Sequence, residues 1–273
     1  MKSHMDTPLI AIKGAGDLAT GVIHRLTRAG FTVLASELAQ PTVLRRTVAF
    51  AEAVTQGRIS VEGSTACHVS TLDEVMQAFA RGDVPVVVDA DGAFVKTMRP
   101  TVLIEATLSK RNSGITINDA PIVIALGPGY EAGKDVHAVI ETNRGHNLGR
   151  VYLQGYAEPN TGVPGMIGGY AAERLLRAPC DGLLYGLRQI GDQVQAGEMV
   201  ALVKEGETSS PIIAAIPGIL RGLVRDELPV YAGMKVGDVD PRVKREHCFT
   251  ISDKSRAVAG GVLEAVMYFM RKM

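Results

Sequence analysis

The chain has 273 residues, of which 46% are hydrophobic, and its 29 basic side chains balance 29 acidic ones. This balance excludes a global field that would draw the protein to nucleic acid or to an anionic membrane. Three cysteines are too few and too widely spaced for a disulfide framework or a zinc knuckle. No apolar run is long enough to cross a bilayer and no signal peptide is recognisable, so we expect a cytoplasmic protein. Met1–Met5, which includes His4, is typical of a cloning remnant and is set aside.

The first half of the chain alternates predicted strands with predicted helices. The strands are apolar runs at 9–14, 32–37, 85–89, 102–106 and 122–126. Helical spacing of apolar residues marks 17–29 and the segment from Thr71 to Gly82. This alternation predicts an α/β fold, a Rossmann-like doubly wound parallel sheet, within a domain over 6–158.

The second half has a different character. Residues 159–177 form a Gly/Pro-rich hinge with a short helix over 170–177, and a C-terminal helix is expected within 244–273. Between them, 181–203 and 217–239 repeat the same frame of glycines and apolar residues. The repeat predicts a small β hammerhead domain, like a barrel-sandwich hybrid, over 178–243. Its central hairpin has no lysine at the tip, so we expect no swinging cofactor arm.

The first strand is followed by a glycine loop that fits the pattern G-x-G-x-x-A, with Gly14, Gly16 and Ala19 at the three positions. In this context Gly14 allows a tight turn, Gly16 lets a phosphate approach, and Ala19 permits close packing of helix on strand. Glu37 ends the second strand, where an acid accepts hydrogen bonds from a ribose diol. The loop therefore predicts a nucleotide site at the start of the first helix.

Asp17 argues against this interpretation, because its carboxylate can cap the helix and repel a pyrophosphate. Arg45 and Arg46 offset that charge or contact a phosphate if they lie near the ribose. A glycine turn without a ligand is the structural alternative.

Polar residues are densest between 105 and 150. Lys110, Arg111 and Asn112 follow a predicted strand, so their loop should face the Gly14 loop and can bind phosphate or carboxylate. Gly127 and Gly129 have the freedom to form an anion-binding nest of amides. An ordinary solvated loop is the alternative interpretation for Lys110, Arg111 and Asn112.

Four further residues are candidates for acid–base chemistry. His137 and Glu141 meet if 136–142 is a strand or a helix, and Arg144 and His146 follow closely. Two histidines and a glutamate match no strong metal signature, so no metal site is assigned. Structural polar contacts remain the alternative.

Several of these segments together resemble a known family. The stretches "KGAGDLATGV", "EATLSKRN", "HAVIET", "PNTGVPG" and "ERLLRAP" are similar to those of the YqeB-like accessory proteins of the selenium-dependent molybdenum hydroxylase system. The first loop also resembles the Rossmann domain of XdhC-type chaperones, which handle molybdopterin. The resemblance implies a pathway and assigns no catalytic residue.

The resulting functional hypothesis is a maturation factor for a molybdenum hydroxylase. It would bind a nucleotide, either NAD(P) or a molybdopterin dinucleotide, and its partners would be the hydroxylase or the proteins that assemble its cofactor. An NAD(P)-dependent oxidoreductase and a scaffold with an empty glycine loop are the alternatives. Whether the chain is an enzyme, and whether it forms a homo-oligomer, stay open.

Overall fold

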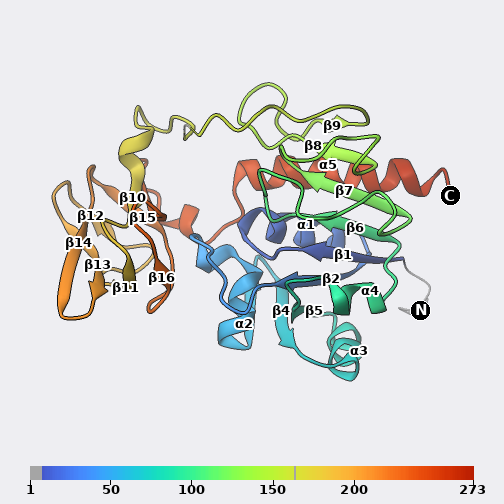
Figure 1. Cartoon of the computed structure of the whole chain (residues 1–273), viewed down its shortest axis with the longest axis horizontal. Helices are drawn as coiled ribbons and strands as arrows, with labels where there is room; N and C mark the ends of the chain where they lie inside the picture. The colour runs from blue at the N-terminus through green and yellow to red at the C-terminus, as the bar shows by residue number, and fades with distance from the viewer. Residues whose placement is uncertain (1–7, 163) are drawn as a thin grey trace. The chain divides into compact units, whose positions relative to one another are not determined.

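The computed structural model describes residues 8–162 and 164–273, which form two compact units (Figure 1). Unit 1 contains the described residues up to Pro41, together with Ala49–Thr161 and Ile251–Met273. Unit 2 contains Thr42–Val48 and the described part of Gly162–Thr250. The presumed cloning remnant, Met1–Met5 with His4, lies outside the described residues.

Unit 1 is built on a nine-stranded sheet in the order β3-β4-β5-β2-β1-β6-β7-β8-β9. The strands are β1 (Leu9–Lys13), β2 (Thr32–Glu37), β3 (Arg58–Val61), β4 (Ser64–Val69), β5 (Val84–Val88), β6 (Val102–Glu105), β7 (Ile122–Leu126), β8 (Ala138–Ile140) and β9 (Val151–Tyr152). Every neighbouring pair from β4 to β8 is parallel. The five predicted apolar runs are thereby confirmed as strands, and β6, β7 and β8 are completely buried.

The prediction of a doubly wound parallel sheet is wrong, because the sheet is mixed. Its edge strands β3 and β9 run antiparallel to β4 and β8. Glu62 and Gly63 make the first of these turns, and both have positive φ, as a two-residue hairpin requires. No helix connects β6 to β7 or β7 to β8, so the far side of the sheet lacks the repeated crossover helices of a Rossmann fold.

Helices cover both faces of the sheet. α1 (Asp17–Arg28) and α5 (Asp253–Met270) pack along each other, and α5 also contacts β7, β8 and β9. α3 (Leu72–Arg81) and α4 (Ala93–Thr97) contribute Val75 and Val95 to a second hydrophobic core, which also contains Ala11 and Leu103 of the sheet. A short helix and a 3-10 turn precede β3, namely α2 (Ala53–Gln56) and η3 (Phe50–Glu52).

Unit 2 consists of two four-stranded antiparallel sheets, ordered β10-β17-β15-β12 and β14-β13-β11-β16. Its elements are η2 (Arg46–Val48), η4 (Ala172–Arg174), β10 (Leu175–Arg177), β11 (Gly182–Gly186), β12 (Gln193–Val194), β13 (Met199–Glu205), β14 (Thr208–Ile213), β15 (Gly218–Leu223), β16 (Pro229–Val230), β17 (Lys235–Asp240) and η5 (Arg245–Cys248). The expected hammerhead assignment is wrong, because the unit is built from two separate antiparallel sheets. Residues 170–177, expected to be helical, form a 3-10 turn followed by a strand.

The sequence repeat is visible in the strands of unit 2. β11 and β15 begin 36 residues apart, and so do β12 and β16, and β13 and β17. Each half supplies strands to both sheets, since β11 pairs with β16 and β15 pairs with β12. The repeat therefore shows which strands correspond, whereas the sheet order depends on pairing between the two halves.

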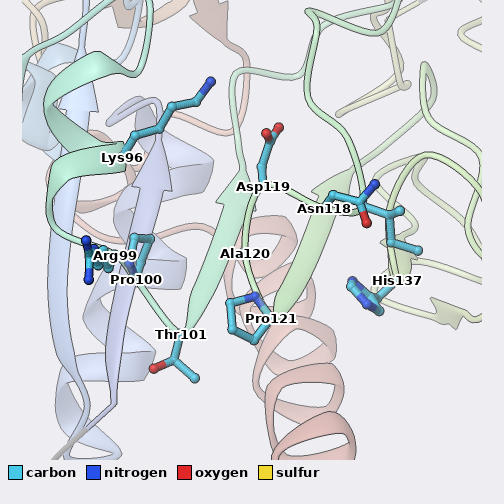
Figure 2. A pocket seen from close by; sticks show the side chains of 10 residues that line it. Lys96, Arg99, Pro100, Thr101, Asn118, Asp119, Ala120, Pro121 and His137 are labelled. Carbon is cyan, nitrogen blue, oxygen red and sulfur yellow. The ribbon is translucent and has the colours of Figure 1, made fainter.

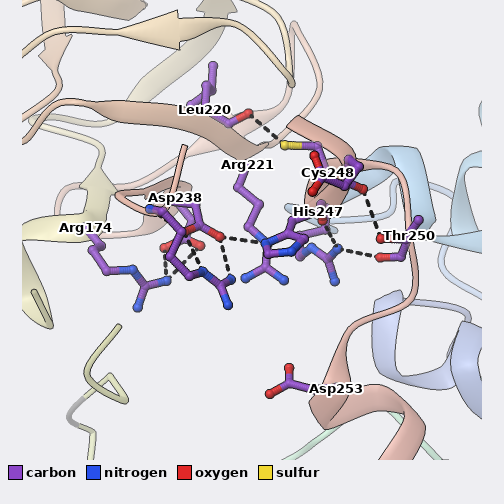
Figure 3. Close-up of polar contacts among 12 residues, drawn as sticks. Arg174, Leu220, Arg221, Asp238, His247, Cys248, Thr250 and Asp253 are labelled. Atoms are coloured by element: carbon purple, nitrogen blue, oxygen red, sulfur yellow. Dashed lines mark hydrogen bonds and ion pairs between the residues drawn. The ribbon is translucent and has the colours of Figure 1, made fainter. Parts of the chain in front are cut away.

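A buried ion pair lies within unit 2 (Figure 3). Arg174 donates from one guanidinium nitrogen to both carboxylate oxygens of Asp238, at 2.8 and 3.0 Å. The Cys248 thiol lies close by in the same view and contacts the carbonyl oxygen of Leu220. Burial raises the pKa of this thiol, so it behaves as a structural cysteine and not as a reactive one.

Candidate active site at the β1–β6 switch point

The order of the sheet places a topological switch between β1 and β6. From β1 the chain moves to β2 on one side, and the strands β6, β7 and β8 then build the other side. In α/β sheets, ligands bind in the crevice outside the carboxyl ends of strands at such a point. Lys13 ends β1 and Glu105 ends β6, paired directly across the switch.

Glu105 and Lys13 lie in a polar cluster with Ser113 and Tyr130. The Ser113 hydroxyl is 3.1 Å from a carboxylate oxygen of Glu105, 2.9 Å from the Tyr130 hydroxyl and 3.5 Å from the Lys13 ammonium. Glu105 and Tyr130 are fully buried, whereas Ser113 is exposed. The cluster thus offers one accessible hydroxyl held by three inaccessible or charged partners.

Hydrogen-bond donors and acceptors fix the direction of this chain. The Tyr130 oxygen accepts the Ser113 amide N–H at 3.1 Å, so its own hydrogen is available to the Ser113 hydroxyl oxygen. The Ser113 hydrogen then points to Glu105, which as a carboxylate only accepts. Burial raises the pKa of Tyr130 and the Glu105 charge adds to this, which keeps the phenol protonated as the assignment requires. A hydroxyl that donates to a buried carboxylate is the arrangement of a nucleophile beside its general base.

The second oxygen of Glu105 is held by the segment that follows β6. It accepts hydrogen bonds from the Thr107 amide, at 2.8 Å, and from the Thr107 hydroxyl. These contacts fix the carboxylate so that its other oxygen faces Ser113. The position of the base is therefore set by the backbone of its own loop.

A narrow cavity of about 70 Å³ adjoins the cluster. Lys13, Ser36 and Ser113 line it near the carboxyl ends of the strands, and Val95 and Leu103 line it further along the sheet face. Lys96, Pro100 and Asp119 line both this cavity and an open hollow of about 740 Å³ (Figure 2). The volume of the hollow lies in the usual range for ligand sites, and the cavity is much smaller.

The glycine loop does not have the role that its pattern predicts. The Ala15 amide donates to the Glu37 carboxylate at 2.9 Å, and the Leu38 amide donates to the other oxygen at 2.8 Å. Glu37 is therefore occupied by the protein's own amides and is not an open acceptor for a ribose. Gly14 has φ of 97°, and a Cβ there would lie 3.2 Å from the backbone of Ala106, so this glycine allows the loop after β6 to approach. This contact involves the start of that loop, at Ala106 and Thr107, and not the Lys110–Asn112 segment.

The other residues of the motif have structural places. Gly16 is the N-cap of α1 with ordinary backbone angles, Asp17 is the first residue of the helix, and Ala19 is buried. Arg45 and Arg46 belong to unit 2, where Arg45 donates to the carbonyl oxygens of His247 and Thr250. Arg46 donates to the carbonyl oxygen of Leu223, so the proposed phosphate role of both arginines is a misassignment.

The loop after β6 and the glycines after β7 pack together. A Cβ on Gly129 would lie 2.9 Å from the Ser109 carbonyl oxygen and 3.0 Å from the Arg111 amide nitrogen. A Cβ on Gly127 would lie 2.5 Å from the Thr142 hydroxyl, so both glycines serve close packing. Lys110 and Arg111 are exposed, and Asn112 braces its own loop through Gly114 and Ile115.

The expected meeting of His137 and Glu141 is also wrong, since they lie at opposite ends of β8. His137 precedes the strand and lines the hollow, where its Nδ1 accepts the Val123 amide at 3.0 Å. Glu141 follows the strand, is fully buried, and accepts the amides of Asn143 and Glu158. Four residue steps along a strand separate the two by about 13 Å, too far for direct proton transfer.

Arg144 and His146 lie in the exposed loop after β8. Arg144 makes a two-pronged salt bridge to Asp253 at 2.7 and 3.1 Å, and His146 is exposed. Half-buried Lys254, which sequence reasoning did not single out, lies nearby. Burial lowers the pKa of Lys254, and the charges of Arg144 and Lys110 lower it further. The charges of Asp17 and Glu141 act in the opposite direction and raise it.

Among residues 8–162 and 164–273, no three His, Cys, Asp or Glu side chains are grouped to hold a metal ion.

Sequence reasoning missed Ser113, Tyr130 and Lys13. The available signal was the pair of charged residues, Lys13 and Glu105, near the ends of two apolar runs predicted to be strands of one sheet. Ser113 is 8 residues from Glu105 in the sequence and 17 residues from Tyr130. Only the folded loops bring these side chains into contact.

No family model matches the chain. Over 264 residues it is 46% identical to a protein of Escherichia coli K12 described as "Uncharacterized protein YqeB", a match that covers 97% of this chain and 48% of the relative. The chain is thus similar to this relative along nearly its whole length, and it spans about half the length of the curated relative it matches. No helix among the described residues has the length and apolar character needed to span a bilayer.

Solved structures that match the chain share little sequence with it. An aspartoacylase family protein from Mesorhizobium loti is 10% identical, covering 85% of this chain and 84% of its own, with a TM-score of 0.28. A succinylglutamate desuccinylase/aspartoacylase from Rhodobacter sphaeroides is 13% identical, covering 85% of each chain, with a TM-score of 0.30. The ectoine utilization protein EutE (DoeB) from Ruegeria pomeroyi is 11% identical over the same shares, with a TM-score of 0.28. Scores this low carry no argument about chemistry.

The expected maturation role and its oxidoreductase alternative both depend on a nucleotide at the glycine loop, and the geometry of that loop corrects them. The physical reason within this chain is the glycine loop, whose Ala15 amide is taken by Glu37. A nucleotide or a molybdopterin dinucleotide is accordingly not assigned to it.

Proposed function

We propose that this chain catalyses acyl transfer or hydrolysis with Ser113 as the nucleophile. The observation that carries the proposal is the exposed Ser113 hydroxyl, which lies 3.1 Å from the buried Glu105 carboxylate at the β1–β6 switch point. Because the chain corresponds to about half of its E. coli relative, the proposal concerns this site and not the activity of a longer protein. The molybdenum hydroxylase system forms no part of it.

The reaction assigns a role to each member of the cluster. The Ser113 oxygen attacks the carbonyl carbon of an ester or thioester while its proton passes to Glu105. The bond from the acyl carbon to the leaving oxygen or sulfur then breaks, and Glu105 returns the proton to the leaving group. Water, activated by Glu105, releases the acyl group from Ser113 and restores the free hydroxyl.

Lys13 and Tyr130 support the charge that develops in this step. The Lys13 ammonium is 3.5 Å from the Ser113 oxygen and so places a positive charge beside the attacked carbonyl. The Tyr130 hydroxyl holds Ser113 by two contacts, one with the Ser113 amide and one with the Ser113 hydroxyl. It is a positioning residue, because it is fully buried and reaches substrate only through Ser113.

A fluorophosphonate probe tests the nucleophile directly. The probe bonds to an activated serine oxygen and loses fluoride, and the labelled peptide is found by mass spectrometry. We expect labelling at Ser113, its loss in Ser113→Ala, and a rate lower by about 100-fold or more in Glu105→Gln. Circular dichroism shows whether the Gln variant is folded.

Ser36→Ala is the matched control, because Ser36 lines the same cavity and its hydroxyl forms no hydrogen bond with Ser113, Glu105 or Tyr130. It should label at the wild-type rate. Equal labelling of wild type and Ser113→Ala, or labelling at another serine, would remove the basis of the proposal.

A further inference from the structure

The hollow beside the narrow cavity is lined by cationic and neutral donor groups. Lys96 and Arg99 lie on one side of it, Asn118 and His137 lie on the other, and Asp119 stands between them in Figure 2. The side chains of Lys96 and Arg99 are exposed and form no hydrogen bond or ion pair with another residue of the described ranges. Two positive charges are thus available to a ligand here.

The other titratable groups of the hollow do not cancel these charges. The Asp119 carboxylate is engaged in its own loop, where it accepts the Thr116 amide at 2.8 Å. Burial lowers the pKa of His137, and its Nδ1 already accepts an amide, so the ring is neutral with Nε2–H as its donor. With Asp119 ionised, the lining carries a net single positive charge and favours an anion.

The narrow cavity joins this hollow to Ser113. Val95, Leu103 and Ile115 supply its apolar lining, and the carboxylate of Asp91 also lines it. From Thr101, which lines the hollow, to Glu105, which contacts Ser113, β6 rises by four residues, or about 13 Å. A cavity of about 70 Å³ favours a slender aliphatic segment.

We propose that the substrate is an ester or thioester of an aliphatic acid that carries a carboxylate or phosphate at its far end. The anionic group binds at Lys96 and Arg99, the aliphatic segment lies along Leu103, and the carbonyl reaches Ser113. This inference rests on the proposed function for its reaction, while the anion-binding end is a separate property of the hollow. The cavity then selects chains by the distance between their charge and the carbonyl.

Binding of ω-hydroxyoctanoate, measured by calorimetry on the full chain, tests the anionic end without any reaction. Its neutral counterpart, the α,ω-octanediol, has the same length and lacks the carboxylate. We expect the carboxylate ligand to bind at least about tenfold more tightly than the diol, and salt to weaken its binding. In Lys96→Met/Arg99→Met this preference should disappear.

Arg28→Met/Arg271→Met is the matched control, because it removes two exposed charges from helix ends that do not line the hollow. It should bind both ligands like wild type. Equal affinity for the two ligands in wild type, or an unchanged preference in Lys96→Met/Arg99→Met, would overturn the inference. These binding results are independent of probe labelling. Equal binding of the two ligands would not contradict the assignment of Ser113 as nucleophile, and a lack of labelling at Ser113 would not contradict the anion site.

Discussion

The amide of Ala15 donates to the carboxylate of Glu37 at 2.9 Å. The glycine loop after β1 therefore holds a negative charge, as its pattern predicts, but the charge belongs to the protein. Gly14 N–H donates to the Ser36 carbonyl oxygen at 2.8 Å, which ties the same loop to the end of β2. The loop is a brace between two strands at the switch point.

Removing this brace should cost stability without creating a nucleotide site. Glu37→Ala leaves the Ala15 and Leu38 amides without their carboxylate, and we expect the free energy of unfolding to fall by about 1–3 kcal/mol. Urea unfolding of wild type and variant measures the difference. Glu37→Gln, which keeps one acceptor oxygen, should lose less, and thermal shift with NAD(P) should show no stabilisation of either protein.

The contact between α1 and α5 is set by a glycine. A Cβ on Gly21 would lie 2.1 Å from the Ser255 hydroxyl oxygen, so Gly21→Ala should push the helices apart and destabilise unit 1 by about 1–3 kcal/mol. Gly21→Ala/Ser255→Gly removes the clashing side chain and should recover part of that loss. The thermal midpoints of the two variants, compared with Ser255→Gly alone, give the coupling; a double variant no more stable than Gly21→Ala contradicts the clash.

Asp240 links the stability of unit 2 to pH. Burial alone raises the pKa of Asp240, but hydrogen bonds from Arg242 and the charges of Arg242 and Arg221 outweigh it and bring the pKa below its usual value. The carboxylate therefore contributes stability above the unfolded pKa, near 4, and this contribution is lost as pH falls through the folded pKa. We expect Asp240→Asn to be less stable than wild type at pH ~6, with the gap narrowing towards pH ~3. A gap that stays constant over this range, measured by urea unfolding at each pH, contradicts the assignment.

Lys254 should be an unusually reactive amine. Because burial and the nearby charges of Arg144 and Lys110 lower its pKa, a larger fraction is neutral at a given pH than for an ordinary lysine. Limited acetylation near pH ~8, read by mass spectrometry, should modify it ahead of exposed Lys134, whose pKa is raised by Glu131. Lys110→Met removes one repelling charge and should slow the modification of Lys254; faster modification would contradict the electrostatic cause.

Local signals in the sequence predicted much of unit 1. The apolar runs at β6 and β7 identified buried parallel strands. The antiparallel pairing at the edges of the sheet was not predictable in the same way. The β3–β4 hairpin depends on Glu62 adopting positive φ, which this residue type rarely does and which no periodicity signals.

The site itself was only partly accessible from sequence. Its charged ends, Lys13 and Glu105, follow from strand order, whereas Ser113 stands 100 residues from Lys13 and meets it through a loop without regular structure. His137 and Glu141 show the opposite error. Their spacing suggested contact, but the three-residue strand β8 lies between them and places one residue at each of its two ends.

The segment Thr42–Val48 has a practical meaning for dividing the molecule. Although it follows β2 in the chain, it belongs to unit 2, where Arg46 donates to the Leu223 carbonyl oxygen and the Leu44 carbonyl accepts the Leu223 amide. A gene fragment that starts at Gly162 would leave both polar groups of Leu223 without these partners. Anyone expressing this half separately should graft the seven-residue stretch onto it or supply it as a peptide.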